Sequence, residues 1–167
     1  MTEEQYIKVT SYFRKNKFRE NILKFLSKFT PLLIVLIYST TLLLLFISNN
    51  YNFRPFLLVP ASNFIFVSLL RKILNKPRPY DLYNYTPIVK YTKGKGMSFP
   101  SRHTSSAFVI TISYFYINHL YLGIFMLFIS LIIALSRILS GVHFPKDVLC
   151  ASVISILWAI VGFHICI

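Results

Sequence analysis

Long apolar segments separated by short polar ones dominate the chain. A helix needs about 20 apolar residues to cross a bilayer. The stretch between Arg102 and Arg137 contains no Asp, Glu, Lys or Arg and is too long for one crossing, so we expect it to divide near Asn118. The apolar segments are residues 29–53, 55–70, 103–136 and 148–167. This pattern predicts an all-α integral-membrane helical bundle of about five transmembrane helices. The runs do not alternate strictly, which argues against a membrane β-barrel.

The first 28 residues differ from the rest of the chain. They contain many basic side chains together with apolar residues at helical spacing, such as Phe18, Ile22 and Phe25. This pattern predicts an amphipathic helix lying in the membrane interface over residues 1–28, followed by a membrane domain over residues 29–167. A solvated helix packed on the bundle is the alternative. The segment lacks the short apolar core and cleavage site of a signal peptide.

Composition narrows the class of partner. Hydrophobic residues make up 55% of the chain and charged residues 14%, yet the formal net charge is +13. The charges are separated from the apolar runs, which favours contact with membrane lipids and a phosphorylated lipid over nucleic acid.

Cys150 and Cys166 share the last predicted helix about 24 Å apart, beyond the reach of a disulfide.

The polar residues near the C-terminus form a candidate catalytic cluster. Pro145 suits the first turn of a helix, so Asp147 would lie in that turn and reach back to His143. A carboxylate on one ring nitrogen leaves the other nitrogen free to attack phosphorus. Arg137 precedes this pair and can bind phosphoryl oxygens. The alternative is a capping Asp beside an interfacial His.

A second cluster, Pro100-Ser101-Arg102-His103, opens an apolar helix. The backbone N–H groups of Arg102 and His103 and the Ser101 hydroxyl are predicted to form an anion cradle at the helix N-terminus. His103 would lie beside the cradle and can donate a proton to a leaving oxygen. An ordinary Ser N-cap followed by a snorkelling Arg is the alternative.

A third cluster, Arg71 and Arg78, follows the second apolar segment. Arginine forks suit phosphate oxygens, although interfacial anchoring is common for basic residues at helix ends. The long loop over residues 72–99 contains Lys90, Lys93 and Lys95, which are candidates to attract anionic headgroups, with a solvated loop as the alternative. Tyr80 is a candidate for shaping the pocket entrance.

Counting the predicted crossings places all three clusters on one membrane face. Two crossings precede Arg71, none separates it from His103, and two more separate His103 from His143. This arrangement favours one composite site. All of the 18 Lys and Arg residues except Arg54 fall on the same face, so the positive-inside rule would direct the site to the cytoplasm.

Taken together, the clusters resemble the signature of the type 2 phosphatidic acid phosphatase superfamily. Its third motif, Ser-Arg, five residues, His, three residues, Asp, is matched completely from Ser136 to Asp147. Its second motif, Pro-Ser-Gly-His, is matched except that Arg102 replaces Gly. Its first motif, Lys, six residues, Arg-Pro, is matched at Arg78 with Arg71 in the Lys position.

The resemblance implies a helical bundle that needs no metal or other cofactor. His143 would attack phosphorus to give a phosphohistidine, with Asp147 as its partner. His103 would protonate the leaving oxygen and then activate water. The phosphate would be held by Arg71, Arg78, Ser101, Arg102 and Arg137.

Relatives act on lipid phosphates at the outer face of the cell membrane, which implies a multi-pass protein with its site outside. Compact bacterial members hydrolyse undecaprenyl diphosphate; phosphatidic acid and phosphatidylglycerol phosphate are equally open as substrates. A lipid phosphotransferase using the same site and a lipid-binding relative without catalysis are the alternatives. The family also includes vanadium haloperoxidases, but those are soluble and the apolar segments argue against them.

Overall fold

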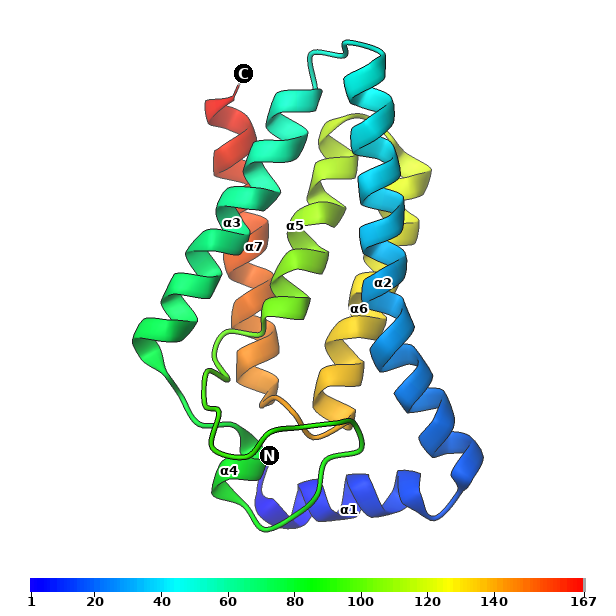
Figure 1. Ribbon diagram of the computed structural model, residues 1–167, viewed down its shortest axis with the longest axis vertical. Coiled ribbons are helices and arrows are strands. Elements are labelled where there is room, and N and C mark those ends of the chain that lie inside the picture. Colours follow the sequence, from blue (N-terminus) through cyan, green and yellow to red (C-terminus); the bar gives the residue numbers. More distant parts are fainter. Residues whose placement is uncertain (167) are drawn as a thin grey trace.

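The computed structural model describes residues 1–166. These residues form helices joined by loops, with no strand among them. The helices are α1 (Glu3–Arg14), α2 (Lys17–Ile47), α3 (Phe53–Leu74), α4 (Pro79–Leu82), α5 (Arg102–Tyr116), α6 (Leu120–Leu139) and α7 (Pro145–Ile165). The five longest run along one axis, and α1 lies across one end (Figure 1). The predicted all-α membrane bundle is confirmed.

The central helix α5 is shorter than a full crossing. Within residues 1–166, four helical segments are long and apolar enough to span a membrane: α2, α3 continuing into α4, α6 and α7. The 15 residues of α5 reach only about 22 Å at about 1.5 Å per residue. The helix starts late because the loop before it enters the bundle, where Ser98 and Ser101 are fully buried. The bundle of about five transmembrane helices that the sequence predicts thus consists of four long helices and the short α5.

The N-terminal segment is divided into two helices. A capping box between Thr2 and Gln5 begins α1, and Asn16 begins α2 by accepting hydrogen bonds from the N–H groups of Phe18 and Arg19 at 2.9 and 3.4 Å. Residues 17–28 are therefore the first turns of α2, continuous with the first span. The predicted single helix over residues 1–28 is interrupted after Arg14, and residue 28 lies inside α2.

Hydrogen bonds in the apolar interior link α5 to its neighbours. α5 packs against α2, α3, α6 and α7 around a core that includes Phe56, Val109 and Met126. Such interhelical bonds are worth about 0.6 kcal/mol each on average in a membrane bundle. The pairs are Asn63–Ser105 (2.9 Å), Ser105–Ser155 (2.6 Å), Thr111–Ser130 (2.9 Å) and Thr41–Tyr114 (2.8 Å). They hold α5 in a fixed position between the spans, and its first turn carries two predicted site residues.

Candidate active site

A cavity of about 160 Å³ lies where the three polar clusters meet, at the end of the bundle crossed by α1. Six of the eight predicted site residues line it, and Ser101 and Asp147 do not. Its lining residues are Arg71, Arg78, Tyr80, Val89, Lys90, Arg102, His103, Arg137, Val142 and His143. Five of these side chains are cationic and none is Asp or Glu. A cavity of this composition suits an anion with several oxygens.

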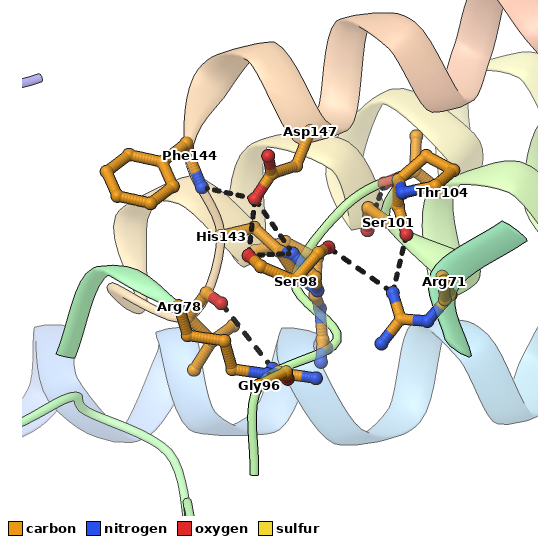
Figure 2. Close-up of polar contacts among 12 residues, drawn as sticks. Arg71, Arg78, Gly96, Ser98, Ser101, Thr104, His143, Phe144 and Asp147 are labelled. Atoms are coloured by element: carbon orange, nitrogen blue, oxygen red, sulfur yellow. Dashed lines mark hydrogen bonds and ion pairs between the residues drawn. The ribbon is translucent and has the colours of Figure 1, made fainter. Parts of the chain in front are cut away.

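His143 lies in the turn between α6 and α7, and Asp147 lies in the first turn of α7 (Figure 2). The Asp147 Oδ2 atom is 3.4 Å from His143 Nδ1 and accepts a hydrogen bond from the Phe144 N–H at 3.0 Å. Both side chains are buried. Gly141 at φ 76° allows the tight turn that brings His143 back toward the helix. With Nδ1 directed at the carboxylate, Nε2 is the ring nitrogen available for chemistry.

Ser98 is a third member of this arrangement that sequence reasoning missed. Its hydroxyl donates to Asp147 Oδ2 at 2.5 Å and lies 3.4 Å from His143 Nδ1 (Figure 2). It comes from the loop before α5, outside the three motifs, and no spacing in the sequence points to it. Ser98 therefore fixes the orientation of the carboxylate that faces the histidine.

Burial keeps the His143 imidazole neutral. Loss of solvent is the main cause that lowers the pKa of His143, from 6.5 to about 4. The hydrogen bond with Asp147 opposes this change, and the positive charge of Arg78 adds to it. A neutral imidazole is the form of histidine that can act as a nucleophile.

Arg71 and Arg78 hold the loop that covers the site as well as lining the cavity. The Nη1 group of Arg71 donates to the carbonyls of Pro100 at 2.5 Å and Ser98 at 3.3 Å. The Nε group of Arg78 donates to the Gly96 carbonyl at 3.1 Å. A guanidinium has five N–H donors, so each arginine retains donors for an anion in the cavity.

Arg137 reaches the cavity from the last turn of α6. Its Nη2 group donates to the Ser27 carbonyl of α2, while its buried Nε has no hydrogen-bond partner.

Arg102 lies with its guanidinium 5.4 Å from the centre of the Phe64 ring, and His103 beside it is exposed. The two consecutive residues thus line the cavity on the side of α3.

Ser101 has a different place from the one predicted. Its N–H donates to the Asp147 carbonyl at 2.9 Å, and its hydroxyl accepts from Thr104 at 3.0 Å. Ser101 is fully buried and does not line the cavity. In this arrangement it attaches the start of α5 to α7, next to Asp147.

A second, largely apolar cavity of about 450 Å³ adjoins the first. It lies between α2, α3 and α5, and it shares Arg102 and His103 with the polar cavity. Its apolar walls come from Pro31, Leu32, Ile34, Val35, Phe64, Ala107, Ile110 and Ile133. A polar pocket joined to an apolar one suits a ligand with an anionic head and a hydrocarbon chain.

Comparison with known proteins shows the family of this chain. The model of the PAP2 superfamily matches residues 52–166, and the chain belongs to that superfamily. It is thus a multi-pass membrane protein in a family of lipid phosphatases. Undecaprenyl-diphosphatase BcrC of Bacillus subtilis is 26% identical over 152 residues, which cover 89% of this chain and 74% of that protein.

Two solved structures share the fold. The crystal structure of Aquifex aeolicus LpxE has a TM-score of 0.76 at 22% identity, covering 96% of this chain and 93% of that one. The transmembrane PAP2 type phosphatidylglycerolphosphate phosphatase from Bacillus subtilis has a TM-score of 0.72 at 21% identity, covering 98% of this chain and 83% of that one. The similarity extends to α1 and α2, which precede the segment that the family model matches.

Proposed function

We propose that this protein removes phosphate from a phosphorylated lipid through a phosphohistidine formed on His143. The observation that supports this most strongly is the junction of two cavities at Arg102 and His103, one cationic and one apolar. The cationic cavity fits a phosphate group, and the apolar cavity offers space for the start of a lipid chain.

In the first step, Nε2 of neutral His143 attacks phosphorus, and the bond between phosphorus and the lipid oxygen breaks. His103 gives its proton to that oxygen, so the lipid leaves as an alcohol or, from a diphosphate, as a monophosphate. Negative charge on the bound phosphate favours the protonated form of His103 beforehand. The arginines hold the equatorial oxygens as charge develops on them.

In the second step, His103 takes a proton from water, which attacks the phosphohistidine. The phosphorus–nitrogen bond breaks, inorganic phosphate forms, and His143 returns to its neutral state. Asp147, held by Ser98, keeps Nδ1 of the imidazole engaged and stabilises the positive charge on the ring in both steps. The scheme uses no metal ion and so predicts turnover in the presence of EDTA.

The substrates that we propose follow from the relatives and from the apolar cavity that adjoins the polar one. One relative is an undecaprenyl-diphosphatase and another is a phosphatidylglycerolphosphate phosphatase. Undecaprenyl diphosphate, phosphatidylglycerol phosphate and phosphatidic acid are therefore the candidates. We place the site at the outer face of the cell membrane, as in the family; turnover by intact cells of a substrate that cannot cross the membrane tests this.

The test is phosphate release by the purified protein in detergent with EDTA, offered the three lipids in parallel. His143→Ala is the inactive variant, and His119→Ala is its matched control because His119 is exposed in the turn before α6, at the opposite end of the bundle. We expect the wild type and His119→Ala to release phosphate from at least one lipid, and His143→Ala to release none. Normal turnover by His143→Ala would contradict the proposal. Labelled phosphate appearing on a lipid acceptor instead of in solution would identify a phosphotransferase.

A further inference from the structure

A third cavity, of about 330 Å³, adjoins the catalytic one and has no role in the scheme above. It lies between the first turns of α2 and the loop before α5, and its walls include Lys24, Ser27, Lys28 and Ile88. Three further lining residues, Val89, Lys90 and Arg137, also line the catalytic cavity. The two cavities therefore meet at these three residues.

Positive charge in this third cavity is only partly compensated. Lys24 pairs with Glu20, one turn earlier on α2, at 2.5 Å. Within residues 1–166, Lys28 and Lys90 form no ion pair, and no acidic residue lines the cavity. The Nε of Arg137 is buried and has no hydrogen-bond partner, and the whole residue is only 7% exposed. Lys24, Lys28 and Lys90 are exposed to solvent, so the buried Nε of Arg137 is the group that an anion would complete, and the three lysines add positive charge around it.

One face of α2 connects this cavity with the apolar one. Lys24, Ser27 and Lys28 line the cationic cavity, and Pro31, Leu32 and Val35 line the apolar cavity. Residues three and four apart lie on the same face of a helix, so the change from cationic to apolar occurs along a single stripe. A lipid whose charged group lies close to its hydrocarbon chain would match this change from cationic to apolar residues. A soluble phosphate would contact only the cationic residues.

We propose that Lys24, Lys28 and Lys90, together with Arg137, form a second phosphate site, which takes the phosphate that stays on the lipid when a lipid diphosphate is cleaved. The inference rests on the proposed function and specifies its substrate class. The terminal phosphate would occupy the catalytic cavity, and the next phosphate, one bridging oxygen away, would occupy the third cavity. The protein is then a lipid diphosphatase in preference to a monophosphatase.

The test compares a prenyl diphosphate with the prenyl monophosphate of the same chain length. Lys28→Gln and Lys24→Gln/Lys28→Gln remove charge from the third cavity only, since Lys90 also lines the catalytic cavity. Lys8→Gln/Lys72→Gln is the control for lost charge, because both lysines are exposed and line neither cavity. Binding is measured in a His143→Ala background, where it does not depend on turnover, and kcat/KM is measured with His143 intact.

We expect the double variant to lower the preference for diphosphate over monophosphate at least about tenfold, in both Kd and kcat/KM, which corresponds to loss of charged hydrogen bonds worth about 1.4 kcal/mol. Lys28→Gln alone should give part of this change, and the control none. Equal losses for both ligands, or none, would overturn the second site. Binding of phosphatidylglycerol, a lipid without a second phosphate, is measured in parallel. If the double variant weakens only that binding, the cavity holds neighbouring lipids and the second phosphate site is overturned. If the wild type binds both ligands but hydrolyses neither, the proposed function is refuted. The Kd values of the lysine variants for diphosphate and monophosphate then still test the second phosphate site.

Discussion

The hydroxyl of Ser98 lies 2.5 Å from Oδ2 of Asp147, across 49 positions of sequence, and both side chains are almost fully buried. The same oxygen faces His143 Nδ1 and accepts the Phe144 N–H, whereas the buried Oδ1 has no partner. The carboxylate is thus oriented through one oxygen. Ser98, which touches neither substrate nor reacting atoms in our scheme, is a positioning residue.

Removing the Ser98 hydroxyl should weaken catalysis with little effect on substrate binding. For Ser98→Ala we expect kcat to fall about 5–30-fold, equivalent to about 1–2 kcal/mol, with KM nearly unchanged. Ser152→Ala is the matched control, because Ser152 bonds only to the Leu149 carbonyl of its own helix. Steady-state kinetics of both variants decide the matter. A Ser98→Ala enzyme with wild-type kcat, or with a change in KM alone, would remove Ser98 from the catalytic arrangement.

The buried His143 should make the protein less stable in acid. Its pKa is about 4 in the folded protein and 6.5 ordinarily, so the unfolded chain binds a proton that the folded one does not between these values. The contribution of His143 to stability is therefore complete above pH 6.5 and is lost as the pH falls toward 4. Thermal unfolding in detergent should show a melting temperature that falls over this range more steeply for the wild type than for His143→Gln. Parallel curves would contradict the lowered pKa.

Tyr6 of α1 supports the turn that carries His143. Its hydroxyl donates to the His143 carbonyl at 3.1 Å, and its ring stacks on Tyr85 with centroids 5.1 Å apart. Tyr85 in turn donates to the Gly141 carbonyl at 2.7 Å. Tyr6→Phe keeps the stacking and loses the hydrogen bond, so we expect kcat to fall about 2–10-fold while KM stays the same.

The exposed Tyr12 provides the comparison for Tyr6, since it lies on α1 away from the catalytic turn. Tyr12→Phe should behave like the wild type. If Tyr6→Phe lowers the melting temperature without lowering kcat at a temperature where it is folded, the contact is structural only.

Arg102 stands where the family most often has Gly, and it lines both the polar and the apolar cavity. In Arg102→Gly the backbone donor remains, but the guanidinium over the Phe64 ring is lost. We expect KM to rise about 3–10-fold, as one exposed charged contact to the substrate headgroup disappears, with kcat within about twofold of the wild type. Arg102→Lys should recover part of the affinity. A fall in kcat with unchanged KM would instead assign Arg102 to the transition state.

Local patterns in the sequence predicted the apolar helices and six of the eight residues that meet at the polar cavity, but not the short length of α5 or the place of Ser101. Apolar runs predict membrane helices because the bilayer imposes their length, and the turn before Pro145 predicts that Asp147 faces His143. The amphipathic pattern over residues 1–28 does not show the Asn16 cap that divides α1 from α2.

Other parts of the site depend on the path of loops, which no local pattern records. Ser98 reaches Asp147 because the segment before α5 enters the bundle, and the same path shortens α5 and directs the Ser101 hydroxyl to Thr104. Lys24 and Lys28 approach the catalytic cavity because α2 packs against α6, where Arg137 donates to the Ser27 carbonyl. Contacts between distant segments of this kind require the folded structure.

The central claim is that His143 carries phosphate during turnover. Its most direct test is rapid quenching of the wild type and His143→Ala with a lipid labelled in its terminal phosphate, followed by mapping of the label on the protein. We predict alkali-stable label on His143 of the wild type and none on the variant. Label on another residue, or release of labelled phosphate by His143→Ala at the wild-type rate, would contradict the account.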